Sequence, residues 1–243
     1  MASRPLAISL LVAAAALLSL SCGGGATLQP PPTKGFTLVW GDEFSGPDGS
    51  SPDSSKWTFD TGVGGNGWGN NELETYCAPT SNTAPCSPSS PNEFIDGSGH
   101  LAIQVRAVGT TYTSARLKTQ GLQSFHAGRI EANIQIPSHA GLWPAFWMLG
   151  SQAGVSWPTV GESDIMENWP TTSNIPGPGA TGNCSTIHTK LTGGSGKGKC
   201  FTLPNGGQVN TAFHAYGEIW SAMTNRPSGD NTRRTSDKKR GTR

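Results

Sequence analysis

The segment GRIEANIQIP, residues 128–137, alternates apolar and polar side chains along most of its length. One face of an extended chain would carry the apolar residues Ile130, Ala132, Ile134 and Ile136. The opposite face would carry the polar residues Arg129, Glu131, Asn133 and Gln135. Successive side chains of a β-strand point to opposite faces, whereas a helix repeats every 3.6 residues. The segment is therefore predicted to be a strand with one buried face.

Further segments of the same character are separated by clusters of glycine, proline, asparagine and serine. They cover residues 36–44, 100–108, 145–149, 185–191 and 213–222. No segment shows a sustained helical period, and the 33 glycines and 18 prolines favour turns over long helices. Many short strands with regular turn signals predict an all-β sandwich.

The first 22 residues have the features of an export signal. Arg4 supplies a positive charge, and the apolar run 6–20 is too short to span a bilayer comfortably. Small residues precede Cys22 and glycines follow it, which resembles a bacterial lipoprotein cleavage site, although Ser19 stands where leucine is usual. We therefore expect an exported bacterial protein, either an outer-membrane or cell-surface lipoprotein lipidated at Cys22 or a secreted protein. Residues 23–34, rich in glycine and proline, are expected to be a flexible tether.

The remaining cysteines would lie in an oxidising compartment, which favours disulfides. Cys77, Cys86, Cys184 and Cys200 allow three pairings. Proximity along the chain favours Cys77–Cys86 and Cys184–Cys200. A zinc site is the alternative, but none of the spacings resembles CxxC and no histidine pairs with these cysteines.

Residues 223–243 differ in composition from the rest of the chain. Seven of the 17 basic residues lie there with two acidic ones, which leaves the remainder with 10 basic and 14 acidic residues. The segment has no aliphatic or aromatic residue after Met223, so we expect it to be disordered. A basic arm for nucleic acid or a membrane is one interpretation, and a truncation or a shifted reading frame is the one we favour. The formal net charge of +1 suggests no nucleic-acid partner.

Three carboxylates lie within six residues of the sequence GESDIMENW. Glu162 and Asp164 are two residues apart and share one face of a regular strand, while Glu167 points to the other face. A β-bulge at Ile165–Met166 would add one residue and return Glu167 to the face of the first two. Both glutamates would then project into one cleft with Asp164 between them.

Two glutamates in one cleft suit retaining glycoside hydrolysis. One carboxyl serves as an ionised nucleophile, and the other is an acid whose pKa is raised by burial and by the charge of its neighbours. Asp164 would hydrogen-bond the nucleophile. A solvated strand edge has the same spacing, and a calcium site would also use clustered acids, although Ca²⁺ loops favour turn residues over isoleucine and methionine.

Several blocks of sequence, taken together and in order, resemble glycoside hydrolase family 16 and, within it, the laminarinase-like endo-β-1,3-glucanases. The blocks lie between residues 36 and 220 and read LVWGDEF, GWGNNELETY, GRIEANIQIP, GLWPAFWMLG and GESDIMEN. The resemblance implies a jelly-roll β-sandwich of the concanavalin A type, with an open substrate cleft on its concave face. It also implies a monomer that cleaves internal β-1,3 bonds of laminarin-type β-glucans by a retaining mechanism. No cofactor is expected for catalysis.

The resemblance assigns roles to matching positions. The pattern ExDxxE makes Glu162 the nucleophile, Asp164 its assisting carboxylate and Glu167 the acid/base. Substrate contacts are implied for six further residues: Asn71, Glu72, Arg129, Trp143, Trp147 and His188. From the residues alone, the two tryptophans could be core, the histidine structural, and the other three turn or surface residues. Glu43 lies where relatives bind a structural calcium ion partly through backbone oxygens, with another ligand near the C-terminus.

The chain departs from the family pattern in two places. Ser163 stands where the family usually has isoleucine or leucine, and we expect it to cost packing and not chemistry. After Trp220 the family continues with further strands, so the catalytic domain, residues 35–222, is expected to be incomplete. The alternatives left open are a hydrolase of mixed-linkage glucan or of an agar-type galactan, a non-catalytic glucan-binding protein, and an inactive fragment.

Overall fold

The structure is a computed structural model, and it describes residues 35–171 and 176–220. The expected signal peptide (1–22) with Cys22, the tether (23–34) and the polar segment 223–243 lie outside these residues. The catalytic domain expected for residues 35–222 falls within them, apart from 172–175 and 221–222.

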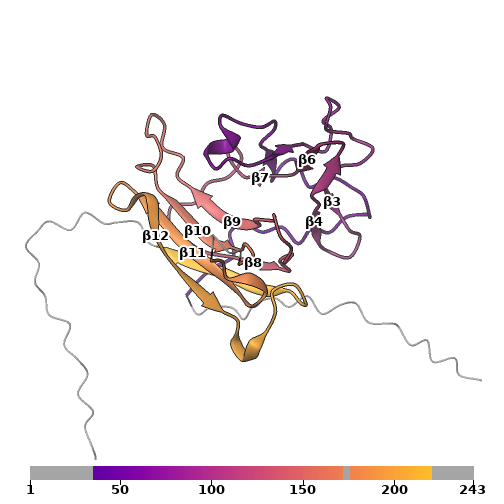
Figure 1. The fold of residues 1–243 in the computed structure, drawn as a ribbon. Helices are drawn as coiled ribbons and strands as arrows, with labels where there is room; N and C mark the ends of the chain where they lie inside the picture. The colour runs from indigo at the N-terminus through magenta and orange to yellow at the C-terminus, as the bar shows by residue number, and fades with distance from the viewer. Residues whose placement is uncertain (1–34, 172–175, 221–243) are drawn as a thin grey trace, which may run out of the picture. The chain divides into compact units, whose positions relative to one another are not determined.

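The described part of the chain consists of β-strands, short 3₁₀ helices and loops, and it has no α-helix (Figure 1). The strands are β1 (Thr58–Phe59), β2 (Glu74–Tyr76), β3 (Glu93–Ile95), β4 (Leu101–Ile103), β5 (Arg106–Val108), β6 (Thr111–Ser114), β7 (Leu117–Lys118), β8 (Gly128–Ile134), β9 (Ala145–Leu149), β10 (Glu162–Glu167), β11 (Gly182–Thr189), β12 (Gly193–Thr202) and β13 (His214–Trp220). The 3₁₀ helices are η1 (Gly67–Gly69), η2 (Gly179–Thr181) and η3 (Pro204–Gly206). The prediction of an all-β chain is confirmed, and no helix within the described ranges is long and apolar enough to cross a membrane.

The core lies between two sheets. One is antiparallel with the order β12-β11-β10-β9, and in the other β8 pairs with β13 (Figure 1). The fully buried members of the core cluster are Ile136, Ile165, Met166, Val209 and Tyr216. Side chains packed around them come from both sheets and a following loop: Ile130, Ile134, Phe146, Met148 and Leu203. The alternation in residues 128–137 is therefore confirmed as the inner face of a strand.

Three smaller sheets precede these two along the chain. They pair β1 with β7, β3 with β4, and β2, β6 and β5 in that order. Within the last of them β2 and β6 run parallel, while β5 and β6 are antiparallel.

The prediction of a strand at residues 36–44 is wrong in this structure. No described segment forms a strand ladder with it, and Leu38 and Val39 are 77% and 80% exposed. Near its end, the Asp42 carboxylate accepts a hydrogen bond of 3.1 Å from the amide of Phe44, whose φ is 50°. Such a local side-chain turn competes with an extended ladder, which also needs a partner strand.

The segment 100–108 is also interrupted, because it forms two strands, β4 and β5. Between them, the Gln104 amide donates a hydrogen bond of 2.6 Å to the carbonyl of Asn92, whose side chain donates to the Gln104 carbonyl at 2.7 Å. This reciprocal pair bends the chain, and β5 then pairs in a different sheet from β4.

Two disulfides join neighbouring parts of the fold. Cys77 is bonded to Cys86 in the loop after β2, and Cys184 to Cys200 at paired positions of β11 and β12. This is the pairing that proximity along the chain favoured.

Glu93 is a buried carboxylate without a partner. It is 0% exposed, and neither of its oxygens has a hydrogen-bond partner among the described residues. Burial raises the pKa of Glu93 to about 7, because the charged form loses its hydration. The folded chain therefore holds this proton at pH values where the unfolded chain, with an ordinary value of 4.5, has released it. The contribution of Glu93 to stability is full below pH 4.5 and is lost as the pH rises towards 7.

We predict that Glu93→Gln reduces the loss of stability between pH 4.5 and pH 7.5. The glutamine cannot ionise, so the variant should lose up to about 3 kcal/mol less unfolding free energy over this interval than the wild type. Urea unfolding at both pH values measures the difference, and Asp48→Asn, which removes an exposed carboxylate, is the control. An unchanged pH dependence in Glu93→Gln would contradict the assignment.

Candidate active site

Strand β10 carries one more residue than the strands beside it. Against β9, Asp164 faces Trp147 and Met166 faces Phe146, so two steps on β10 correspond to one step on β9. The register against β11 shifts in the same region. The extra residue is Ile165, and the predicted β-bulge is confirmed.

The bulge is fixed from both sides of the strand. Ile165 and Met166 are 5% and 1% exposed and belong to the core. The Ser185 hydroxyl on β11 donates a hydrogen bond of 2.7 Å to the carbonyl of Ile165, so the bulged peptide keeps a partner. As a result, Glu162, Asp164 and Glu167 share the face of the sheet that is turned away from the core.

Each of the two glutamates accepts a hydrogen bond from an indole. Trp143 Nε1 donates to Glu167 Oε1 at 2.9 Å, and Trp157 Nε1 donates to Glu162 Oε2. Trp143 is 52% exposed and Trp157 49%, so neither is a core residue. Each indole occupies one carboxylate oxygen.

Asp164 lies between the glutamates and beside His188. Its Oδ2 is 3.1 Å from His188 Nε2, and the ligand atoms of Glu162, Asp164 and His188 lie within 4.8 Å of one another. Burial raises the pKa of Asp164 to about 8, and the negative charges of Glu167 and Glu162 add to the effect. The carboxyl is therefore displaced towards its protonated form.

The proton on Asp164 has two possible acceptors. The Gly194 carbonyl lies 3.0 Å from His188 Nδ1, and a carbonyl can only accept, so Nδ1 carries a hydrogen. In the neutral ring Nε2 is then an acceptor for the Asp164 proton, as is the Glu162 carboxylate. A proton shared in this way reduces the negative charge of the group formed by Glu162, Asp164 and His188. Side chains of these types could also hold a divalent cation, and we assign no ion to this group.

Glu167 also has a raised pKa. Burial is the largest cause, and the charge of Glu162 adds to it. Hydrogen bonds from Trp143 and Thr186 and the neighbouring His188 act in the opposite direction. Glu167 is thus displaced towards the protonated form that a general acid needs.

Trp147 is held by a cation stacked on aromatic rings. The Arg116 guanidinium lies 5.0 Å from the Trp147 ring centroid, 4.8 Å from that of Trp68 and 5.6 Å from that of Tyr76. Glu72 accepts a hydrogen bond of 2.6 Å from the Tyr76 hydroxyl, and its Oε1 is 3.9 Å from Arg116 Nη1. The structure therefore brings Glu72 and Trp147 into one cluster, and Trp147 faces Asp164 in register, while their roles towards a substrate stay predictions.

Glycines on β12 leave room for the rings next to the carboxylates. A Cβ on Gly194 would lie 3.0 Å from the Trp157 ring, and one on Gly196 would lie 2.6 Å from the His188 ring. The two rings themselves are 5.6 Å apart between centroids. A side chain at either glycine would displace the ring and with it the contact that this ring makes to a carboxylate.

Two residues of the expected substrate-binding set lie apart from the carboxylates. Asn71 is exposed, with φ of 59°, in the loop after η1. Arg129 forms an ion pair with Glu131, on the face of β8 opposite to the core residue Ile130. Neither makes a hydrogen bond or ion pair with the three carboxylates within the described residues, and their roles stay predictions.

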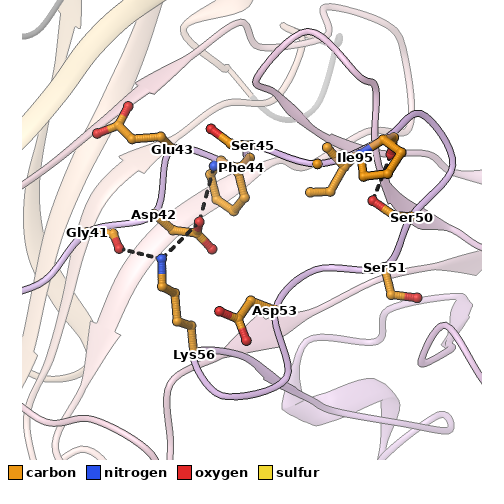
Figure 2. Close-up of a pocket in the computed structure, with 12 residues that line it drawn as sticks. Gly41, Asp42, Glu43, Phe44, Ser45, Ser50, Ser51, Asp53, Lys56 and Ile95 are labelled. Carbon is orange, nitrogen blue, oxygen red and sulfur yellow. Dashed lines mark hydrogen bonds and ion pairs between the residues drawn. The ribbon is translucent and has the colours of Figure 1, made fainter.

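Glu43 lines a pocket of about 440 Å³ that is remote along the chain from β10 (Figure 2). Beside it, the Asp42 carboxylate is engaged by Lys56 Nζ at 3.2 Å and by Trp57 Nε1 at 2.8 Å. Lys56 also donates to the Gly41 carbonyl at 2.8 Å. Among the described residues no group of three metal-ligating side chains includes Glu43. The expected site would use backbone oxygens in part, so the assignment of Glu43 stays a prediction.

Sequence reasoning missed Trp157 and Arg116. Trp157 lies only five residues before Glu162, so an aromatic residue next to the carboxylate motif was an available signal. Arg116 had no such signal, because it meets Trp147 only through the folding of distant segments.

Comparisons with known proteins agree with this geometry. Residues 102–216 match the family described as "XgeA-like, catalytic GH16 domain". A β-glucanase from Rhodothermus marinus is 36% identical over 195 residues, which are 76% of this chain and 60% of that protein. The chain thus spans well under two thirds of the length of this relative.

Solved structures give the same result. A laminarinase from Rhodothermus marinus has a TM-score of 0.60 at 35% identity, and an endo-β-1,3-glucanase from Pyrococcus furiosus has 0.60 at 36% identity. Each match covers 76% of this chain and 67% of the other. The expectation of a jelly-roll sandwich is confirmed by this likeness.

We predict that the pKa of Asp164 falls in Glu167→Gln. The substitution removes the negative charge of Glu167, which is the largest cause of the raised Asp164 pKa after burial. Carboxyl ¹³C NMR titration of the full chain should show Asp164 titrating near pH 8 in the wild type and at lower pH in the variant. Asp48→Asn should leave the value unchanged. An Asp164 that titrates near its ordinary 3.8 in the wild type would refute this account of the cluster.

Proposed function

The chain belongs to glycoside hydrolase family 16, and on that premise we propose that it hydrolyses internal β-1,3-glucosidic bonds of laminarin-type β-glucans with retention of configuration. The observation that carries the proposal is the bulge at Ile165, which sets Glu162, Asp164 and Glu167 on one face of β10. The names of similar proteins, a β-glucanase and laminarinases, support this substrate class.

In the first step, a Glu162 oxygen bonds to the anomeric carbon while the bond from that carbon to the leaving sugar oxygen breaks. The proton of Glu167 passes to the leaving oxygen. In the second step, water attacks the anomeric carbon, Glu167 takes the proton of the water, and the bond to Glu162 breaks. Burial prepares Glu167 for the first step by raising its pKa, and the ionised form made there is the base needed in the second.

Asp164 and Trp157 act on the nucleophile. A protonated Asp164 can donate a hydrogen bond to Glu162, and the indole of Trp157 donates another. In the second step the charge returns to the Glu162 carboxylate as it leaves the anomeric carbon, so both bonds strengthen and stabilise this leaving group.

Three tryptophans offer ring faces for sugars: Trp143, Trp147 and Trp157. The apolar face of a pyranose packs against an aromatic ring while its hydroxyls remain at the edge for hydrogen bonds. Trp143 is hydrogen-bonded to the acid/base, and Trp157 is hydrogen-bonded to the nucleophile. The two rings therefore flank the position where the scissile bond would lie.

We also propose an exported location for the protein. The two disulfides support it, because such bonds persist in oxidising compartments. The lipid anchor at Cys22, a monomeric state and a structural calcium ion are further proposals that rest on the sequence alone.

The proposed mechanism predicts that Glu162→Ala lowers the rate of laminarin hydrolysis at least about 10³-fold, because no nucleophile is left. Azide should restore activity towards an activated aryl glycoside by entering the space of the carboxylate. Proton NMR of the first wild-type products should show the β-anomer. Near-normal hydrolysis by Glu162→Ala, or an α-anomer first, would sink the mechanism, and faster cleavage of lichenan or agarose than laminarin would reassign the substrate.

For Trp157→Phe we predict a kcat about tenfold lower with little change in KM. Phenylalanine keeps a ring against Gly194 but cannot donate to Glu162, and a charge-assisted hydrogen bond contributes roughly 1.5 kcal/mol. Steady-state kinetics on laminarin measure the two constants. Wild-type kcat in this variant would show that the indole N–H is dispensable.

A further inference from the structure

The reverse face of the catalytic strand carries a polar pair that the mechanism does not use. Ser163 lies between Glu162 and Asp164, and its hydroxyl donates a hydrogen bond of 2.5 Å to Oε2 of Glu218 on β13. Because adjacent residues of a strand face opposite ways, Ser163 points to the interior side of β10, where β13 lies.

The neighbours of this pair are mostly apolar. Ser163 is flanked in register by Met148 on β9 and Ile187 on β11, and Glu218 is opposite Ile130 on β8. Glu218 forms no ion pair with a basic side chain in the ranges that the structure covers. Its charge is therefore not neutralised locally, and the Ser163 hydroxyl is the hydrogen bond that holds it.

Few titratable groups face Glu218. On its own strand, Tyr216 and His214 share its face, and His214 is turned to the carbonyl of Gln208 at 3.1 Å. On the paired strand β8, the positions on this face are apolar, and β9 and β11 present Met148 and Ile187. From β10, the nearest acids are Glu162 and Asp164, on the far side of one strand.

We propose that Glu218, held by Ser163 on the reverse face of β10, is a positioning residue whose negative charge acts on Asp164 through this strand. The catalytic consequence rests on the function proposed above. Glu162 and Glu167 act on Asp164 from the cleft, and Glu218 acts on it from the interior.

The electrostatics agree with the geometry. After burial and the two glutamates of the cleft, the charge of Glu218 is a further cause that raises the pKa of Asp164. A single charge that acts through the width of a strand shifts a titration by about 0.5 to 1 pH unit. The Ser163–Glu218 hydrogen bond is part-buried, so water screens this charge less than a fully exposed one.

The pair also changes the interpretation of Ser163. The sequence led us to expect a packing loss where the family usually has isoleucine or leucine. An aliphatic residue could not donate to Glu218, and an unpartnered carboxylate between the sheets would be destabilising. Ser163 and Glu218 are therefore matched to each other across the core.

The test is the titration of Asp164 in Glu218→Gln, followed by carboxyl ¹³C NMR on the full chain. The amide can still bond to Ser163 but carries no charge. We expect Asp164 to titrate about 0.5 to 1 pH unit lower than in the wild type, and the high-pH limb of kcat/KM on laminarin to move the same way. Asp48→Asn removes one exposed charge and should move neither.

Two further variants separate charge from packing. Ser163→Ala keeps the charge and should lower the unfolding temperature while leaving the Asp164 titration nearly in place. Ser163→Ile with Glu218→Leu replaces both partners by apolar groups and should lower the Asp164 titration as Glu218→Gln does. It also serves as the test if Glu218→Gln does not fold.

An Asp164 titration that stays at its wild-type value in both charge-removing variants would overturn the proposal and leave the pair a packing feature. A shifted titration in a chain that does not hydrolyse laminarin would uphold the role of Glu218 and refute the proposed function. The two proposals can therefore fail separately.

Discussion

The site depends on one surplus residue in a strand. A regular β10 would send Glu167 into the core whenever Glu162 and Asp164 faced the cleft, and a buried unpaired carboxylate is strongly unfavourable. Ile165 resolves the conflict, because it lets two consecutive side chains, Ile165 and Met166, enter the core. The hydrogen bond from Ser185 compensates the peptide that the bulge removes from the ladder. The indole contacts and the coupled titrations of the cluster all presuppose this arrangement.

Crowding three acids on one face creates an electrostatic problem that protons and donors relieve. The pKa of Asp164 is raised towards the neutral form, and each glutamate has an indole N–H within reach. A donor stabilises the charge on an anion, while burial and neighbouring charges oppose ionisation. The balance differs at each position, so chemically similar side chains acquire different tasks.

Local pattern was enough to predict some parts of this structure. The alternation in residues 128–137 predicted β8, and the parity of GESDIMENW predicted the bulge, because both depend on neighbours in sequence. The segment 36–44 has an equally strand-like pattern but lacks a ladder, since pairing depends on distant chain. Arg116 and Glu218 were missed for the same reason: each acquires its meaning from a strand far away in sequence.

The two indole contacts allow tryptophan fluorescence to report on the carboxylates. Trp143 and Trp157 donate hydrogen bonds from Nε1 of the indole to Glu167 and Glu162, and both rings are about half exposed to solvent. A change in the charge or covalent state of either glutamate alters the field at its own tryptophan. Two of the chain's eight tryptophans thus report on the proposed cleavage site, one from each side, and neither needs a label.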